Sequence, residues 1–310
     1  MRAKYYKIGQ APPVRHWYQK RVGWFGKLCV SVFVMSVIGA GAMEYTIVQN
    51  DTRALAAQTS KSNKLKKVTS APLEQTDAQN IIDIQTVIDH WVAEHPAQKW
   101  GVVAKSINGP TFDAKINADK EFESASIYKL FLVMPLFNQI AVEHQKNIKV
   151  NIGGGQKPIA TCVDLMLRLS NNECGEAIGN YLNWSKADKM LKTNGFTHTT
   201  FKETNKLRTS AGDTASFLEQ LNGDMLNRTA KDTVMRSLRE QRWRSGIPTG
   251  CPGCIVANKT GDIDNVTHDA AIVQYKGGSY VLVIFSEGGN FKQISELTGQ
   301  IQQKILDTTK

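Results

Sequence analysis

Segments with the residue pattern of β-strands occur in two groups that lie far apart along this chain of 310 residues. The first group comprises residues 100–107 and 111–116, which are joined by the strong hairpin signal Asn108-Gly109. The second group comprises residues 254–259, 268–274 and 280–285, with Gly277-Gly278 at the last turn. Neither group can cover its apolar side chains alone, so we predict that both join in one antiparallel sheet.

Helical periodicity surrounds and separates these strands. Apolar residues recur at helical spacing over 77–95 and again over 291–305, which predicts one amphipathic helix at each end of the domain. Further helices are expected after Ser126, over 161–169, from Glu173, and over 185–193, 209–222 and 229–240, whereas the Gly-rich residues 144–160 are expected to form a loop. We predict an α+β fold in which the terminal helices cover one face of the sheet and the helical block covers the other.

The N-terminal segment combines positive charge with an apolar stretch. Residues 1–27 carry seven Lys and Arg residues and no carboxylate, and sixteen uncharged, mostly apolar residues follow at 28–43. Extended to Val48, the apolar stretch reaches the length of about 20 residues that crosses a bilayer. We therefore expect a basic cytoplasmic tail at 1–27 and a transmembrane anchor at 28–48. A cleaved signal peptide is the alternative, because Ala40-Gly41-Ala42 has the small-residue pattern of a cleavage site.

A polar stretch at 49–76 is predicted to be a flexible linker, and the catalytic domain is expected at 77–310. Both interpretations of the apolar stretch place this domain outside the cytoplasm, either on the cell membrane or secreted. Residues 1–27 account for +7 of the formal net charge of +10, so the high pI reflects the tail. No nucleic-acid-binding motif is present in the sequence, and we expect no nucleic-acid partner.

Four cysteines lie in the predicted exported domain: Cys162, Cys174, Cys251 and Cys254. An even number in an oxidising compartment favours disulfide bonds, although the pairing depends on geometry that the sequence does not show. The separation of Cys162 from Cys174 argues against a four-cysteine zinc site. A redox-active turn at Cys251-Pro-Gly-Cys254 would need a surrounding βαβ unit, which the pattern lacks. We expect no metal and no other cofactor.

Ser126 and Lys129 form a Ser-x-x-Lys motif that opens an apolar run. Residues three apart share one face of a helix, so the Lys129 amine can reach the Ser126 hydroxyl. A Ser hydroxyl is a poor nucleophile until a base takes its proton, and a desolvated Lys can be neutral enough to do so. The motif indicates nucleophilic catalysis, but a single motif of this length also occurs by chance.

Two further motifs make the assignment more specific. Ser170-Asn171-Asn172 and Lys259-Thr260-Gly261 follow in the same order, and the three motifs together resemble those of class A β-lactamases and penicillin-binding proteins. The resemblance covers about residues 77–310 and implies the β-lactamase/transpeptidase-like fold. It also implies that Ser126 attacks a carbonyl, that Lys129 takes its proton, and that Ser170 relays a proton to the leaving nitrogen.

The same resemblance implies roles in binding. Lys259 holds Ser170 and the substrate carboxylate, Thr260 hydrogen-bonds this carboxylate, and Asn172 holds a substrate amide. The backbone N–H groups of Ser126 and of Asp262, which follows Gly261, form an oxyanion hole. Two alternatives stay open, because Asn172 can be a helix cap and Thr260 an ordinary strand residue. His268 and Asp269, on the neighbouring strand, are expected to be structural.

The sequence departs from the family pattern at three places. Asn171 stands where the family usually has Asp, and Asp262 adds a carboxylate near a subsite for an anion. Class A β-lactamases carry a long loop with a Glu that activates the deacylating water, spaced four residues from an Asn. Here the short segment 201–206 offers only Glu203, two residues before Asn205. We therefore expect slow deacylation, with Glu203 as the candidate base.

Two classes of function fit these features. The first is an exported serine hydrolase that reacts with β-lactams through an acyl-enzyme, with a D-alanyl-D-alanine peptidase acting on peptidoglycan as the alternative enzyme. The second is a non-catalytic binding protein of the cell envelope with the same fold. The complete set of catalytic side chains favours the enzyme, whereas the short loop and Asp262 favour the binding protein. Covalent labelling of Ser126 by a penicillin distinguishes the two classes.

Overall fold

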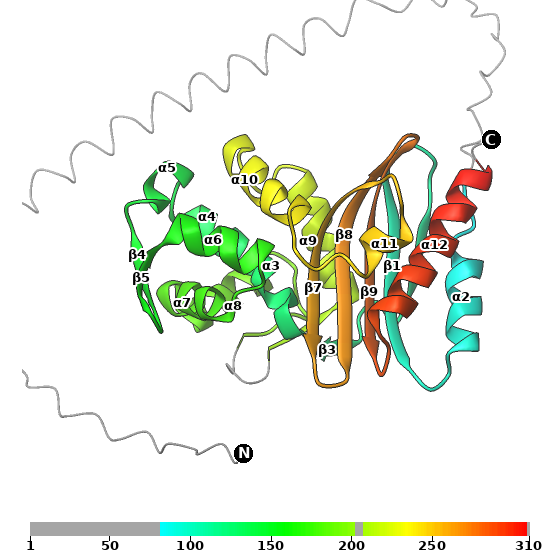
Figure 1. Cartoon of the computed structure of the whole chain (residues 1–310), viewed down its shortest axis with the longest axis horizontal. Helices are drawn as coiled ribbons and strands as arrows, with labels where there is room; N and C mark the ends of the chain where they lie inside the picture. Colours follow the sequence, from blue (N-terminus) through cyan, green and yellow to red (C-terminus); the bar gives the residue numbers. More distant parts are fainter. Residues whose placement is uncertain (1–80, 202–206, 309–310) are drawn as a thin grey trace, which may run out of the picture. The chain divides into compact units, whose positions relative to one another are not determined.

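The computed structural model describes residues 81–201 and 207–308 (Figure 1). The predicted tail, anchor and linker of residues 1–76 and the candidate base Glu203 lie outside the described residues. Within the described part, the strands of the main sheet are β1 (Lys99–Asn108), β2 (Asp113–Ile116), β7 (Ile255–Ile263), β8 (Val266–Tyr275) and β9 (Gly278–Glu287). Their order is β2-β1-β9-β8-β7, and every neighbouring pair is antiparallel. Because β1 pairs with β9, with Val102 opposite Ile284, the prediction that the two strand groups join is confirmed.

The sheet is buried on both faces, because successive side chains of a strand point to opposite sides. On β9, Val281, Val283 and Phe285 pack into one hydrophobic core. Leu282 and Ile284 pack into a second core on the other face. Burial of both faces explains why the sequence of β9 is almost continuously apolar, as is typical of a central strand.

Helices cover both faces of the sheet, as the α+β prediction required (Figure 1). Helices α2 (Gln85–Glu94) and α12 (Phe291–Thr308) pack on one face, where Trp91, Leu297 and Ile301 share a core with Leu282 of β9. Helix α9 (Ala211–Asn222) packs on the other face, where Phe217 contributes to the opposite core. This arrangement confirms the predicted fold class.

The helical block is the second half of the domain. Its helices are α3 (Tyr128–Phe131), α4 (Val133–Gln139), α5 (Val142–Gln145), α6 (Ile159–Arg168), α7 (Asn172–Leu182), α8 (Trp184–Thr193) and α10 (Arg228–Arg239). The short α11 (Ile247–Gly250) lies on the other face, where Ile247 joins the core of α2 and α12. Two small sheets complete the fold, β3 (Glu121–Glu123) with β6 (Arg208–Ser210) and β4 (Lys149–Ile152) with β5 (Gly155–Pro158). Pro135 lies in α4, and its ring conflicts with the carbonyl four residues earlier, at Phe131, where α3 ends.

Two predicted elements were wrong in part. Residues 81–84 are not helical as the predicted helix 77–95 required, because the N–H of Ile82 donates to the carbonyl of Thr111 at 2.9 Å and Asp83 accepts from the N–H of Thr86 at 3.1 Å. Residues 144–160 are not one loop, since Gly153-Gly154 forms the turn of the β4–β5 hairpin. The two strands of the hairpin have four residues each, which is too short for a hydrophobic period to reveal them.

Two disulfide bonds form among the described residues. Cys162 of α6 pairs with Cys174 of α7, with 4.8 Å between their Cα atoms, and this bond joins the two helices around Ser170. Cys251 pairs with Cys254, with 5.5 Å between their Cα atoms, directly before β7. Both bonds restrict the segments that lead to motif residues.

Within residues 81–201 and 207–308, no helix is long and apolar enough to cross a bilayer. The predicted anchor at 28–48 lies outside these residues and stays a prediction.

Candidate active site

Ser126 lies in a tight turn, η1 (Ala125–Ile127), between β3 and α3. The preceding residue, Ala125, adopts a left-handed conformation with φ of 44°, which is uncommon for a residue with a side chain. Gly261 of β7 packs against this turn, and a Cβ at Gly261 would lie 3.0 Å from Ile127 Cγ1 and 3.2 Å from Ala125 Cβ. Glycine at this position therefore allows the strand to lie beside the nucleophile.

Lys129 is fully buried. Its amine contacts Ser126, Ser170 and Asn172. Its Nζ lies 3.0 Å from Ser126 Oγ, 2.7 Å from the carbonyl oxygen of Ser170 and 2.6 Å from Asn172 Oδ1. A neutral amine has two N–H donors and one lone pair. When Lys129 donates to Ser170 and Asn172, its lone pair is left for the Ser126 hydroxyl.

Burial lowers the pKa of Lys129 to about 8, and the negative charge of Glu176 opposes this shift. An ordinary lysine has a pKa of about 10.4, so the neutral amine is far more populated here near neutral pH than in an exposed lysine. The site thus provides both the geometry and the protonation state that a general base requires.

Ser170 connects the two amines of the site. It lies between α6 and α7 in a left-handed conformation with φ of 57°. Its Oγ lies 2.9 Å from Lys259 Nζ and 3.5 Å from Lys129 Nζ. The contacts form a chain from Ser126 through Lys129 and Ser170 to Lys259, along which a proton can move between the nucleophile and a leaving group.

Lys259 of β7 is fully buried, and its Nζ also donates to the carbonyl of Thr260 at 2.7 Å. Burial and the charge of Lys129 lower the pKa of Lys259 well below its ordinary value. An anion beside Lys259 acts in the opposite direction, because an opposite charge favours the protonated amine. A substrate carboxylate would therefore draw a proton to Lys259 and leave Lys129 as the neutral partner.

Asn171 and Asn172 have different local roles. Asn171 is the cap of α7, where its Oδ1 accepts from the N–H of Cys174 at 2.8 Å. An Asn in place of the usual Asp therefore still satisfies the helix end. Asn172 is not the cap but accepts from Lys129, so the alternative that Asn172 serves as a helix cap was wrong.

Thr260 and Asp262 point to one side of β7. Thr260 Oγ1 accepts from Nε2 of the buried Gln241 at 3.1 Å, an interaction that the motifs did not reveal. Asp262 Oδ1 accepts from Thr267 Oγ1 at 3.3 Å, so part of its charge is satisfied on β8. The predicted oxyanion hole of the Ser126 and Asp262 N–H groups is not tested by these contacts and stays a prediction.

A buried polar network supports β7 behind Lys259. Asp269 Oδ1 accepts from Asn258 Nδ2 at 2.9 Å, and Asp269 Oδ2 accepts from the N–H of Ile247 at 2.9 Å. Burial raises the pKa of Asp269 to about 6, although the hydrogen bond from Asn258 and the charge of Lys259 oppose the shift. The structural role expected for Asp269 is consistent with these contacts, because they fix the segment before β7.

His268 lies on β8, beside the Ser126 turn. Its Nε2 contacts the carbonyl of Glu123 at 2.8 Å, and its Nδ1 accepts from the N–H of Ser286 at 3.2 Å. These partners assign a neutral ring with the proton on Nε2. Burial lowers the pKa of His268 to about 4, so the ring is neutral at physiological pH and joins β3 to the sheet.

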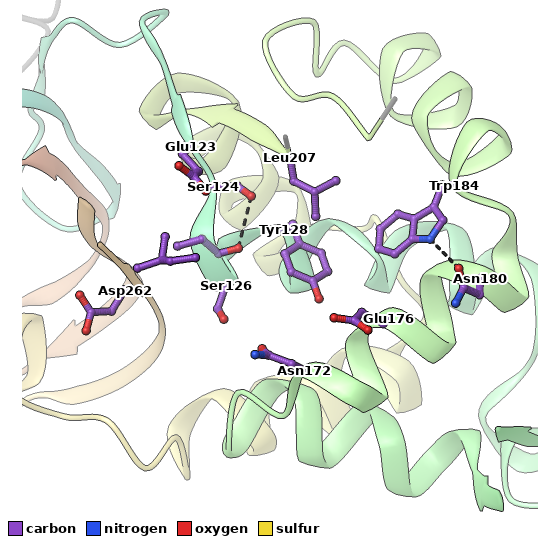
Figure 2. Close-up of a pocket in the computed structure, with 12 residues that line it drawn as sticks. Glu123, Ser124, Ser126, Tyr128, Asn172, Glu176, Asn180, Trp184, Leu207 and Asp262 are labelled. Carbon is purple, nitrogen blue, oxygen red and sulfur yellow. Dashed lines mark hydrogen bonds between the residues drawn. The ribbon is translucent and has the colours of Figure 1, made fainter. Parts of the chain in front are cut away.

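An open cavity of about 600 Å³ leads to Ser126 (Figure 2). It is lined by Ser126 and Asp262 on one side and by α7 on the other, where Asn172, Glu176 and Asn180 face it; the remaining lining residues are Glu123, Ser124, Ala125, Tyr128, Trp184, Leu207 and Ile263. The motifs did not indicate Glu176, which lies one helical turn after Asn172. No cluster of three His, Cys, Asp or Glu side chains suited to a metal occurs among the described residues.

Comparisons with known proteins agree with this geometry. The family model of the beta-lactamase enzyme family matches residues 83–309. The chain therefore belongs to the beta-lactamase enzyme family, and it is a serine hydrolase by its fold and motifs. None of the curated proteins compared with it is a significant match.

Solved structures show the same fold at low sequence identity. A mutant of the penicillin-binding protein PBP-A, solved as an acyl-enzyme complex with penicillin G, has a TM-score of 0.66 and 19% identity, covering 74% of this chain and 98% of that one. A β-lactamase from Sphaerobacter thermophilus has a TM-score of 0.62 and 16% identity, covering 74% and 98%. The TLA-3 extended-spectrum β-lactamase has a TM-score of 0.64 and 15% identity, covering 72% and 98%.

Proposed function

We propose that this chain is an exported serine hydrolase that reacts with β-lactams through an acyl-enzyme on Ser126 and releases the acyl group slowly. The observation that carries the proposal is the placement of Lys129 Nζ, 3.0 Å from Ser126 Oγ, while its two shortest contacts are to the carbonyl oxygen of Ser170 and to Asn172 Oδ1. This arrangement lets a neutral amine accept the Ser126 proton.

In the acylation step, Ser126 Oγ forms a bond to the lactam carbonyl carbon while its proton moves to Lys129. The C–N bond of the lactam then breaks, and the leaving nitrogen receives a proton from Ser170, which is replenished from Lys129 or Lys259. Lys259 and Thr260 hold the substrate carboxylate, and Asn172 holds the acyl amide. The contacts of the free site and the family's motifs support these proposed roles.

Slow release is supported by the sequence around Glu203. Hydrolysis of the ester needs a water molecule and a base, and a positioned general base accelerates such a step by about 10²–10⁴-fold. Glu203 is separated from Asn205 by two residues in a short segment, which differs from the spacing of the family's base. All the side chains expected to act in acylation are present. We therefore expect hydrolysis of the acyl-enzyme to be the slower of the two steps.

Export is supported by the two disulfide bonds, which persist in oxidising compartments. The basic residues 1–27 and the apolar residues 28–48 support anchoring of the domain in the cell membrane, with the catalytic part on the extracytoplasmic side. A peptide ending in D-alanine presents the same acyl centre and carboxylate as a penicillin, so a peptidase acting on peptidoglycan is the alternative enzyme.

A fluorescent penicillin tests the proposal. The wild-type protein is expected to carry a covalent label that survives denaturation, and Ser126→Ala is expected to carry none. Labelling of Ser126→Ala at the wild-type level would overturn the assignment of the nucleophile. A folded wild-type protein without any label would instead support the non-catalytic binding protein.

A further inference from the structure

The cavity continues beyond the reacting atoms along helix α7. Asn172, Glu176 and Asn180 recur every four residues and therefore share one face of the helix. Eight residues of helix extend for about 12 Å, so this wall is longer than the contact with one amide requires. Tyr128, Trp184 and Leu207 also line the cavity, and Trp184 Nε1 donates to Asn180 Oδ1 of α7 at 2.8 Å (Figure 2).

Glu176 differs from the two asparagines on this wall. Asn172 Oδ1 accepts from Lys129 at 2.6 Å, and Asn180 Oδ1 accepts from Trp184 Nε1 at 2.8 Å. Glu176 forms no hydrogen bond or ion pair with the residues that the structure describes. In Figure 2 its carboxylate points into the cavity, on the side of the Tyr128 ring.

Among the described residues that line the cavity, no Lys or Arg is available to Glu176. The nearby amine of Lys129 responds to the charge of Glu176, but Lys129 must be neutral to accept the Ser126 proton. Within the described lining of the cavity, the charge of Glu176 therefore has no cationic partner in the reactive form of the free site.

We propose that the wall formed by Asn172, Glu176 and Asn180 is the subsite for the acyl side chain, and that Glu176 selects acyl donors whose side chain carries an ammonium group. This inference rests on the function proposed above. Helical side chains lean toward the N-terminus of their helix, so the Glu176 carboxylate lies on the Asn172 side of its own Cα. An amine a few bonds from the amide at Asn172 therefore reaches it.

The aromatic lining suits the same ligand. Tyr128 and Trp184 line the cavity and provide apolar surface for the carbon skeleton of the side chain. An anionic side chain in the same place faces Glu176 without a counter-charge and is disfavoured. The subsite thus distinguishes side chains by charge, whereas Lys259 and Thr260 hold the carboxylate common to all substrates.

Three penicillins of one skeleton test the inference: benzylpenicillin and its derivatives with an α-amino or an α-carboxy group. The second-order rate constant of acyl-enzyme formation is measured by mass spectrometry for the wild-type protein, Glu176→Gln and the control Glu173→Gln. Glu173 is on the same helix but does not line the cavity. Ratios between compounds within one variant cancel any general effect of a substitution on the acylation rate.

The wild-type protein and Glu173→Gln are expected to react with the amino compound about tenfold faster than with the carboxy compound, the effect of one charge contact that is partly exposed to water. In Glu176→Gln this ratio is expected to fall at least about fivefold relative to wild type. An equal ratio in wild type and Glu176→Gln would overturn the inference and leave the proposed function intact. Failure of all three penicillins to acylate folded wild-type protein would overturn the proposed function and the inference with it.

Discussion

The Nζ of Lys259 lies 2.9 Å from the Oγ of Ser170, and this contact joins β7 to the junction of α6 and α7. The two residues are 89 positions apart in the sequence. Lys259 belongs to the sheet, and Ser170 belongs to the helical block. A substrate that binds both residues must therefore lie in the boundary between the sheet and the helical block. Catalysis at this place therefore requires the sheet and the helical block to keep their relative position.

The first prediction concerns Ser126 and Lys129, which act as one unit. Ser126→Ala is expected to abolish covalent labelling by a penicillin. Lys129→Met, which keeps the volume of the buried side chain, is expected to lower the acylation rate by about 10²–10⁴-fold because the hydroxyl loses its base. The double variant should be no slower than the slower single variant, since effects within one unit are not additive.

Circular dichroism and thermal unfolding serve as the control for these variants. Lys129 is fully buried, so a variant that fails to fold would be uninformative at this position. A folded Lys129→Met protein that acylates at the wild-type rate would contradict the role of Lys129.

The second prediction concerns Gly261. In Gly261→Ala, the new Cβ would lie 3.0 Å from Ile127 Cγ1 and 3.1 Å from the carbonyl oxygen of Ser124, so β7 and the Ser126 turn must move apart. We expect acylation to be at least about tenfold slower, because a displaced nucleophile loses much of its positioning. Gly154→Ala is the matched control, since a Cβ there meets no atom within 4 Å. Equal acylation rates in both variants would show that the close approach of β7 is not needed.

The third prediction is a pH dependence of acylation. The active form of Lys129 is neutral, and its pKa is lowered to about 8 by burial. The second-order rate constant should therefore rise with pH, with a midpoint near pH 8 instead of the value near 10.4 of an ordinary lysine. Because Glu176 raises the pKa of Lys129, Glu176→Gln should move the midpoint to lower pH. A rate constant that does not change between pH 6 and pH 9 would exclude Lys129 as the titrating base.

The order of strands and helices was sufficient to predict the α+β class. Two distant groups of apolar strands can cover their faces by joining in one sheet between two layers of helices. The sequence did not indicate β3, β6 or the β4–β5 hairpin. These strands have only three or four residues each, and β3 pairs with a segment far along the chain, with Glu121 opposite Ser210. Periodicity within one segment carries no information about such a partner.

The site was predictable where three motifs coincide in order. The structure brings together Ser126, Lys129, Ser170, Asn172 and Lys259, as the resemblance implied. Gln241 and Glu176 were not predicted. Gln241 reaches Thr260 from the segment after α10, and Glu176 reaches the cavity from the second turn of α7, so neither lies within a motif. The spacing of four residues places Glu176 on the same helix face as Asn172, and this spacing could have indicated that Glu176 lines the site.

The fourth prediction concerns the stability of the fold in acid, where His268 and Asp269 have opposite effects. Burial lowers the pKa of His268 to about 4, so its contribution is present above the unfolded value of about 6.5 and is lost as the pH falls through 4. Burial raises the pKa of Asp269 to about 6, so its contribution is present below pH 3.8 and is lost as the pH rises through 6. Each contribution is at most about 3 kcal/mol.

Denaturant unfolding at several pH values separates the two groups. Between pH 4 and pH 6 their contributions compensate in the wild-type protein. Relative to wild type, the free energy of unfolding of His268→Gln should decrease as the pH rises over this range, whereas that of Asp269→Asn should increase. Two variants with the slope of the wild-type protein would show that neither group titrates with a perturbed pKa.

The lifetime of the acyl-enzyme tests the central claim of fast acylation and slow release most directly. The protein is mixed with benzylpenicillin, and its intact mass is followed over time for wild type, Glu203→Gln and Glu176→Gln. The account predicts an adduct on Ser126 that forms rapidly and persists for many seconds or longer in all three proteins. Rapid turnover of wild type without an adduct, slowed about a hundredfold by either substitution, would contradict it and would show that a carboxylate of this site activates the deacylating water.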